Sequence, residues 1–311
     1  MSVYTTISEE ALKTFLSHYD VGELKQFEGI LAGIENTNYF VDTTKGRFVL
    51  TIFEQLVWDE LPYFLDIMAF LAEHEVPSAH PIADRQGDYL RRLQEKPAAL
   101  VERLEGGGVD HPNQTQCAEI GTALGRMHAM AHNFEGQREN PRGLNWCQTS
   151  SSQLKEKLSA EDQALLADEL TTQHALARST LPQGVIHADL FRDNALFIDD
   201  HLTGIIDFYY ACNDALLYDV AVTCNDWCTE ATGGINETRY HALLNHYQQQ
   251  RPLSETEQKA WPIMLRAAAL RFWLSRLLDL HFPRPGEMTQ TKDPETFKAI
   301  LQWHRNHPLS I

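Results

Sequence analysis

The sequence is most constrained by a polar loop that lies between two apolar runs within residues 184–198. Its polar side chains follow the spacing H-x-D-x-x-x-x-N, with His187, Asp189 and Asn194 at the three named positions. The next apolar run along the chain ends in a lone acidic residue, Asp207. Short apolar runs beside turn residues are typical of buried strands. The pattern therefore predicts a polar loop that is held in place by strands.

A hairpin is predicted directly after this loop. Residues 194–198 and 203–206 are apolar enough to form two short strands, and residues 199–201 contain two aspartates that favour a turn. Asn194 would then stand at the start of one strand, and Asp207 just beyond the end of its partner. Because the partners of an antiparallel hairpin lie side by side, the two side chains should be close in space.

These side chains suit phosphoryl transfer. Mg²⁺ is a hard cation that takes oxygen ligands and keeps water or phosphate oxygens in the rest of its shell. Asn194 and Asp207 could hold it on the phosphates of a nucleotide, while Asp189 accepts the proton of an attacking hydroxyl. The alternative is that these residues and His187 are ordinary turn residues. That would require four spaced positions and two strands to coincide by chance.

The loop resembles the catalytic loop of protein kinases, with Asp207 in the place of the aspartate of their D-F-G. The tripeptide here is Asp207-Phe208-Tyr209, which is more similar to the aminoglycoside phosphotransferase family, whose members phosphorylate small molecules. The resemblance implies an α+β, two-lobed protein-kinase-like fold, with a small N-lobe on an antiparallel sheet and a mainly helical C-lobe. It also implies ATP as co-substrate and Mg²⁺ as cofactor.

Composition disfavours several other classes. The chain has 311 residues, 26 basic and 43 acidic, and a net charge of −17, which argues against a nucleic-acid partner. Its most apolar segment, residues 263–280, contains three arginines and an aspartate, so we expect no membrane span. The N-terminus lacks the basic and apolar regions of a secretory signal. Five scattered cysteines without a C-x-x-C pair predict reduced thiols in a cytoplasmic protein, not disulfides or a zinc site.

The N-terminal part is expected to form the smaller lobe. A helix over residues 8–18, capped by Ser8, and another over residues 59–74 accompany five strands. We place the domain boundary at a run of three glycines, with a nucleotide-binding N-lobe over residues 1–105 and a catalytic, acceptor-binding C-lobe over residues 106–311. The five expected strands cover residues 25–30, 38–41, 47–53, 89–93 and 98–104.

The resemblance also implies nucleotide contacts in this lobe. In the family the first hairpin folds over the phosphates, which points to Gly33 and Asn36 in its loop. The third strand often carries a Lys or Arg for the phosphates, but Thr51 stands there in this sequence, and what replaces the cation is left open. The connection between the lobes binds adenine through backbone groups, which points to Glu102 and Leu104.

Helical spacing predicts C-lobe helices over residues 115–133, from 160 to about 178, and over 263–280, with an irregular polar stretch at residues 135–149. His128 and His132 are four residues apart, as in zinc proteases. The residue after His128 is Ala129 and not glutamate, so we expect one packed and one surface histidine instead of a metal site.

Two acidic residues of the segment 213–227 are candidates for the site. In the family a Tyr-Asp pair opens a helix, and its aspartate supports the catalytic loop by hydrogen bonds. This implies that Asp219, with His187, holds the loop, and the alternative for Asp219 is a plain helix N-cap. Asp226 could receive a substrate amine, or it could be a surface carboxylate.

An arginine on the apolar helix 263–280 needs an anionic partner if it is buried. For Arg276 that partner could be a substrate carboxylate, or an internal acid such as Asp279. Arg271 lies about 140° away around the helix and cannot point the same way.

The segments Asn225-Asp226-Trp227, Ser275–Asp279 and Val49–Glu54 are similar to those of the homoserine kinases within the family. This resemblance implies ATP-dependent phosphorylation of the L-homoserine hydroxyl to O-phospho-L-homoserine, in threonine biosynthesis. Two alternatives stay open. One is a kinase for another small alcohol or amino sugar, such as choline, methylthioribose or an aminoglycoside. The other is a nucleotide-binding pseudokinase that acts as a sensor, which Thr51 favours and the intact polar loop opposes.

Overall fold

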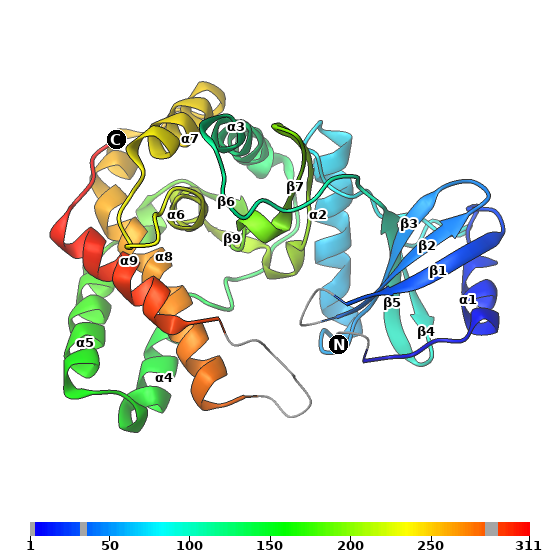
Figure 1. Ribbon diagram of the computed structural model, residues 1–311, viewed down its shortest axis with the longest axis horizontal. Helices are drawn as coiled ribbons and strands as arrows, with labels where there is room; N and C mark the ends of the chain where they lie inside the picture. Colours follow the sequence, from blue (N-terminus) through cyan, green and yellow to red (C-terminus); the bar gives the residue numbers. More distant parts are fainter. Residues whose placement is uncertain (1–3, 32–35, 284–291) are drawn as a thin grey trace. The chain divides into compact units, whose positions relative to one another are not determined.

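The computed structural model describes residues 4–31, 36–283 and 292–311. The chain divides into two compact units, one of residues 1–106 with 204–206 and one of residues 107–203 with 207–311. The first unit is built on a β-sheet, and the second is mainly helical (Figure 1). The polar loop belongs to the second unit.

The first unit contains the predicted five-stranded sheet. Its strand order is β1-β2-β3-β5-β4, and each neighbouring pair is antiparallel. The expected strands are confirmed, with ends that shift by one or two residues in most cases. Their bounds are β1 (Leu24–Ile30), β2 (Thr37–Thr43), β3 (Arg47–Ile52), β4 (Leu90–Leu93) and β5 (Lys96–Glu102).

One face of this sheet packs against α1 (Glu9–Leu16). The helix begins where Ser8 caps it, as predicted, and buries Leu12 and Phe15 in a core shared with Leu50 and Ile52 of β3. Because side chains alternate along a strand, Thr51 belongs to the opposite face of the sheet. A second helix, α2 (Leu61–Glu73), follows a 3₁₀ turn at Trp58–Glu60 and has a proline in its first turn, where no hydrogen bond is lost.

The second unit contains seven α-helices among its described residues. Further 3₁₀ turns are Ala131–Asn133, Lys155–Lys157, Arg178–Thr180, Arg192–Asn194 and Phe208–Tyr210. The helices are α3 (Gln114–Met130), α4 (Leu144–Leu154), α5 (Ala160–Ala175), α6 (Leu216–Trp227), α7 (Glu237–Gln250), α8 (Glu255–His281) and α9 (Pro294–Asn306).

The expectation of an irregular stretch at residues 135–149 is wrong from Leu144 onward, where α4 begins. The helix buries Cys147, Ser150 and Leu154, which recur at helical spacing. Two of these three are small or polar, so the apolar pattern that would have predicted the helix is weak. The expected helix to residue 178 also ends earlier, at Ala175.

The longest helix, α8, forms the centre of the second unit. It packs against α4, α5, α6 and α9, and buries Trp261 and Trp273 (Figure 1). Ser254 caps its start in a capping box with Glu257. A helix covered on several sides is apolar around most of its circumference, which explains its hydrophobic sequence without a membrane.

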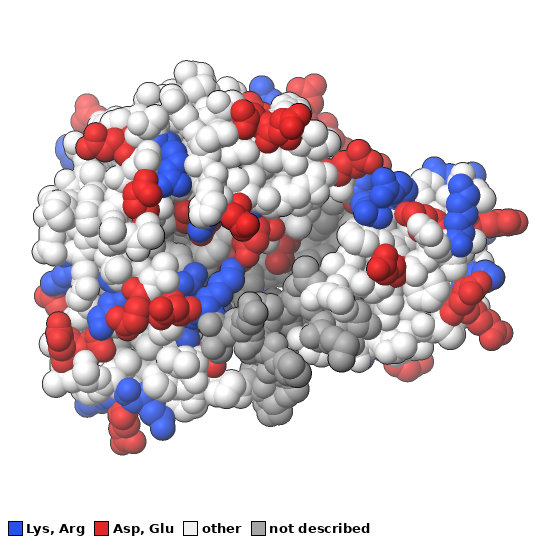
Figure 2. All heavy atoms as spheres, viewed as in Figure 1, with Lys and Arg blue, Asp and Glu red and all other residues white. Residues whose placement is uncertain are grey.

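Charged side chains lie on the surface of the protein, and the cysteines lie in its interior. Acidic and basic side chains lie interspersed on the face of the molecule seen in Figure 2. All five cysteines are buried and free. In the part of the chain that the structure describes, no helix is long and apolar enough to cross a membrane.

Helix α9 is joined to α6 by a buried polar contact. His304, with 2% of its surface exposed, lies with Nε2 2.8 Å from Asn225 Oδ1, and Asn225 Nδ2 donates to Leu265 O of α8. Within the described residues His304 Nδ1 has no hydrogen-bond partner. Burial, with the nearby charge of Arg266, therefore lowers the pKa of His304 to about 3.

Because of this contact, we expect the free energy of unfolding to fall in acid. An unfolded histidine titrates near pH 6.5, whereas folded His304 does not bind a proton until about pH 3. The free energy of unfolding should therefore have its full His304 contribution above pH 6.5. As the pH falls below that value, it should decrease by about 1.4 kcal/mol per pH unit. In urea unfolding between pH 5 and 7, H304Q should lose this part of the pH slope. H132Q, which changes an exposed histidine, should keep the wild-type slope, and an unchanged slope in H304Q contradicts the assignment.

Candidate active site

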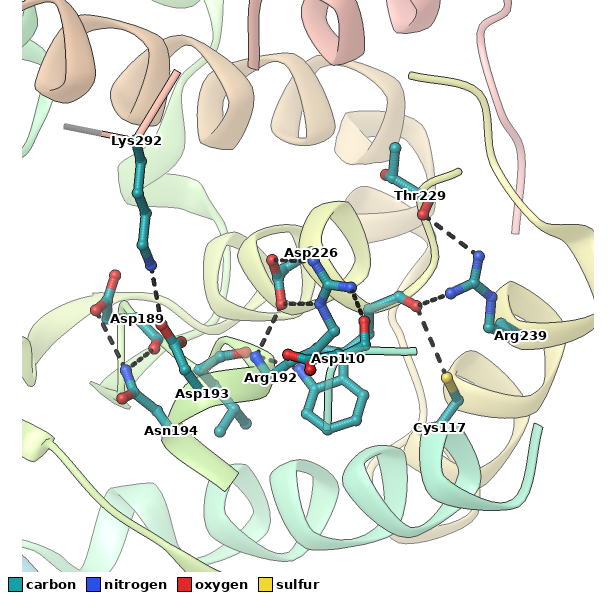
Figure 3. Close-up of polar contacts among 12 residues, drawn as sticks. Asp110, Cys117, Asp189, Arg192, Asp193, Asn194, Asp226, Thr229, Arg239 and Lys292 are labelled. Atoms are coloured by element: carbon teal, nitrogen blue, oxygen red, sulfur yellow. Dashed lines mark hydrogen bonds and ion pairs between the residues drawn. The ribbon is translucent and has the colours of Figure 1, made fainter. Parts of the chain in front are cut away.

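The polar loop connects two short strands of the second unit. It begins after β6 (Gln183–Ile186), which pairs with β9 (Cys212–Ala215), and ends at β7 (Ala195–Ile198). Asn194 Nδ2 donates to Asp189 O at 2.9 Å and to Asp189 Oδ2 at 3.3 Å (Figure 3). Since the amide nitrogen is used within the loop, the carbonyl oxygen of Asn194 is the atom left to serve as a ligand.

The predicted hairpin is confirmed, and Asp207 stands just beyond its second strand. Strand β7 pairs with β8 (His201–Ile205), and Asn194 directly precedes β7. Asp207 follows β8 by two residues, is exposed, and has a left-handed backbone with φ of 65°. Non-glycine residues adopt this conformation rarely, and often at functional sites. The next residue, Phe208, is buried, with its ring centroid 4.6 Å from that of His187.

Asp189 is a poorly hydrated carboxylate between charges of both signs. Burial raises its pKa to about 7, with the charge of Asp207 adding to the rise and that of Arg271 opposing it. Arg271 Nη1 lies 3.6 Å from Asp189 Oδ1, and the arginine side chain is only 5% exposed. A carboxyl group with a raised pKa can take up a proton near neutral pH, which is the property of a general base.

The loop is anchored by Asp219, which is completely buried and lies in the first turn of α6. Its Oδ2 accepts the backbone N–H of His187 at 2.7 Å, and its Oδ1 accepts that of Ala188 at 2.8 Å. Ala188 has a φ of 64°, a turn that lets two successive N–H groups reach one carboxylate. Because Ala215 is the N-cap of α6, the alternative of a plain N-cap for Asp219 is wrong.

Asp219 also ends a chain of buried hydrogen bonds. His128 Nε2 lies 3.1 Å from its Oδ2, and since a carboxylate can only accept, this nitrogen carries the proton. His128 Nδ1 then accepts from Tyr247, whose hydroxyl accepts from Arg251, both at 2.9 Å. Arg251 in turn donates to Glu257, the capping residue of α8, at 2.8 Å.

The electrostatics of these hydrogen-bonded residues favour an ionised Asp219. Burial alone would raise the pKa of Asp219, but the hydrogen bonds from His128 and the loop hold it below its ordinary value. Burial lowers the pKa of His128, which stays neutral. The expectation of one packed and one surface histidine is confirmed, because His128 is buried and His132 is exposed.

Asp226 has a partner that the sequence did not suggest. It lies in α6 and accepts Arg192 N at 2.8 Å and Arg192 Nε at 3.0 Å, with Arg192 Nη2 3.4 Å from its other oxygen (Figure 3). Arg192 also donates to Asp110 O at 2.6 Å. Both oxygens of Asp226 thus contact one arginine of the loop, which does not favour the expected role in binding a substrate amine.

Arg276 is engaged elsewhere as well. Its Nη1 donates to Asp293 O at 2.8 Å, and its guanidinium lies 4.5 Å from the ring centroid of Phe297. Burial lowers its pKa. The arginine of α8 within ion-pair distance of the candidate base is Arg271, and the charge of Asp189 also acts on Arg276. In the sequence Arg271 is visible as a basic residue on an apolar helix, but the sequence does not give the rotation of that helix about its axis.

The expected nucleotide contacts lie in the first unit. Gly33 falls outside the described residues, and Asn36 is buried. Thr51 is buried and donates to Asn38 Oδ1, across β2 and β3, at 2.8 Å. Glu102 and Leu104 are the residues expected to bind adenine through their backbone. Of these two, Glu102 already donates its N–H to His80 O at 2.9 Å. This leaves Leu104 as the better backbone donor of the pair.

The phosphotransferase enzyme family matches residues 26–253. The chain is 48% identical over 302 residues to a homoserine kinase of Methylobacillus flagellatus, and the match covers 97% of this chain and 95% of that one. It is 43% identical over 301 residues to a homoserine kinase of Neisseria meningitidis serogroup B, with 97% and 99% covered. The chain belongs to the phosphotransferase enzyme family. Within it, the chain belongs to the homoserine kinases.

Solved structures support the fold class. An amicoumacin kinase in complex with AMP-PNP and Ca²⁺ superposes with a TM-score of 0.73 at 14% identity, covering 97% of this chain and 95% of that one. A spectinomycin phosphotransferase in complex with ADP gives 0.67 at 14% identity, with 96% and 95% covered. The expected kinase-like α+β fold is therefore confirmed.

The anchor of the loop predicts a large effect on stability. D219A should leave two buried N–H groups and His128 without their acceptor, which lowers the free energy of unfolding by about 3 kcal/mol. D219N, which keeps one acceptor oxygen, should lose less. Urea unfolding followed by tryptophan fluorescence measures both, with E156A at an exposed glutamate as control. A D219A midpoint equal to that of E156A contradicts the role of Asp219.

Proposed function

We propose that this protein is a homoserine kinase, which transfers the γ-phosphoryl group of ATP to the side-chain hydroxyl of L-homoserine and forms O-phospho-L-homoserine and ADP, a step of threonine biosynthesis. The observation that carries the proposal is the 48% identity to a homoserine kinase over 97% of the chain. The residues that phosphoryl transfer needs, Asp189, Asn194 and Asp207, are all present in one loop and hairpin.

In this reaction Asp189 orients the homoserine hydroxyl and takes its proton. The hydroxyl oxygen forms a bond to the γ-phosphorus, and the bond between that phosphorus and the oxygen bridging to the β-phosphate breaks. The raised pKa of Asp189 supports proton uptake. Positioning contributes much of the rate, so the hydrogen bonds that fix the loop through Asp219 serve catalysis indirectly.

Asn194 and Asp207 are the residues we assign to Mg²⁺. Their donor set fits: one amide oxygen and one carboxylate suit a hard cation that keeps water and phosphate ligands. Among the described residues no group of three or more His, Cys, Asp and Glu could hold a metal by itself. A site completed by ATP phosphates is consistent with that. When bound, the ion would supply charge neutralisation of the phosphates.

We assign nucleotide binding to residues 1–105 and catalysis with acceptor binding to residues 106–311. In the first part, Gly33 and Asn36 are proposed for the phosphates, and the backbone of Leu104, with Glu102 beside it, for adenine. Thr51 is proposed to face the nucleotide from the sheet face opposite α1. Its hydrogen bond to Asn38 supports a polar patch there in place of a cation.

The substrate is tested by ADP release from ATP and Mg²⁺ with homoserine, serine, threonine, choline, methylthioribose and kanamycin. We expect turnover with homoserine only, and a fall of about 10²- to 10⁴-fold in kcat for D189N. E156Q alters an exposed glutamate outside the loop and serves as the control. Turnover of another acceptor instead of homoserine rejects the substrate, and ATP binding without any turnover indicates a sensor.

The metal assignment predicts a change in Mg²⁺ dependence. D207N should raise the Mg²⁺ concentration for half-maximal activity by at least about 10-fold, because it removes a charged ligand. Chelation of the ion with EDTA should abolish activity in the wild type. ADP release is measured against Mg²⁺ at fixed ATP, with E156Q as the control. If D207N lowers kcat but keeps the wild-type Mg²⁺ dependence, Asp207 is not a ligand.

A further inference from the structure

Three arginines line one small cavity of the second unit. Arg142 precedes α4, Arg178 follows α5 and Arg271 lies in α8, so arginines far apart in the sequence line the same cavity. Cys147 and Tyr218 complete much of the lining. In a chain with 26 basic and 43 acidic residues, three arginines around one cavity, one of them buried, need an explanation.

The acidic partners of this cluster do not balance it. Arg271 lies 3.6 Å from Asp189, and Arg178 lies 3.9 Å from Asp214. Asp214 also accepts a hydrogen bond from Asn140 at 2.7 Å, so it is shared. In the described parts of the chain no carboxylate lies within ion-pair distance of Arg142. Three arginines against two aspartates leave a net positive charge, which favours binding of an anion.

Aromatic rings hold the guanidinium groups in place. That of Arg142 lies 4.6 Å from the ring centroid of Trp146 and 5.9 Å from that of Tyr210, and that of Arg271 lies 5.3 Å from the same Tyr210 ring. Stacked arginines are pre-oriented and lose little freedom when they bind a ligand. Tyr210 thus joins Arg142 and Arg271 into one pair, three residues beyond Asp207.

Arg271 belongs to this arginine cluster and also contacts the polar loop. Arg271 lines the cavity and contacts Asp189, so an anion on Arg142 and Arg271 would lie next to the candidate base. In homoserine the hydroxyl oxygen and the carboxylate are separated by three C–C bonds and one C–O bond, roughly 5 Å when extended. The cavity has a volume of only about 10 Å³, room for one water, so the acceptor itself must lie outside it, on the Tyr210 side.

We propose that Arg142 and Arg271 bind the carboxylate of the acceptor and so select an amino acid as the substrate. Arg178, paired with Asp214 and 5.1 Å from the ring centroid of Tyr218, adds positive charge behind them. This inference rests on the proposed function, and it assigns the carboxylate to these arginines instead of Arg276. Guanidinium groups bind carboxylates through two parallel hydrogen bonds, which supplies both affinity and orientation.

The experiment measures R142A, whose side chain is partly exposed and whose loss should not prevent folding. Three constants are compared with the wild type: KM for homoserine, Ki for L-2-aminobutyrate, which keeps the carboxylate but lacks the hydroxyl, and Ki for 3-aminopropan-1-ol, which keeps the hydroxyl but lacks the carboxylate. We expect the first two to rise about 10- to 100-fold. The third, and KM for ATP, should change less than about 2-fold, and R142K should lie between R142A and the wild type.

R126A, at an exposed arginine of α3, is the matched control and should behave as the wild type. A rise of all three acceptor constants together, or of none, overturns the proposal, because a merely structural arginine does not distinguish ligands by their carboxylate. The two proposals also fail differently. If the wild type does not phosphorylate homoserine, the proposed function is wrong. If it does, and R142A keeps the wild-type preference for carboxylates, only the arginine assignment is wrong.

Discussion

The structure of the site depends on one buried carboxylate, that of Asp219. Two successive backbone N–H groups of the polar loop and one imidazole share its two oxygens, and all of these groups are buried. A buried charge is tolerated only when its hydrogen bonds are complete. Each donor therefore has to stay where it is, and the left-handed turn at Ala188 follows from that requirement. The loop is rigid because any movement would expose an unpaired charge in the protein interior.

Helix α6 supplies further fixed points for the same loop. About two turns beyond the buried carboxylate along the helix, Asp226 holds Arg192 at both backbone and side chain, and Trp227 Nε1 donates to Leu190 O at 3.1 Å. The loop is thus bound at its start, middle and end by one helix. Catalysis by positioning needs side chains held to within about half an ångström, and contacts from a single rigid element achieve this better than contacts from several mobile ones. Asp189 and Asn194 lie within this clamped segment.

Much of this arrangement could be predicted from the sequence, because its signals are local. The apolar runs, the turn residues and the helix caps each act over a few positions, so the hairpin, the five strands and the cap at Ser8 were predictable. Contacts that join distant segments had no such signal. The partner of Asp226 is 34 residues away, and nothing near either residue indicates the pairing. Helix α4 was missed because small and polar residues form much of its buried face.

The choice between Arg271 and Arg276 could not be predicted from the sequence for a different reason. Both lie on one apolar helix, and both are basic residues with the same local surroundings. Only the rotation of α8 against its neighbours decides which one meets Asp189, and that rotation is set by packing of the whole helix against α4, α5, α6 and α9. Sequence reasoning identified the requirement for an anionic partner but could not tell which arginine lies within ion-pair distance of Asp189.

Charge balance explains why the arginines and the base belong together. Burial by itself would keep Asp189 protonated, and a second carboxylate beside it, on the acceptor, would raise its pKa further. A protonated Asp189 cannot accept the hydroxyl proton. Positive charge held close to both carboxylates removes this conflict, because it stabilises the ionised base and the bound acid at the same time. Arg271 is placed to contact the base, and Arg142 has no competing carboxylate in the described parts of the chain. The net charge of the cluster would thus change from positive to neutral when the acceptor carboxylate binds, so that both carboxylates keep a cation beside them.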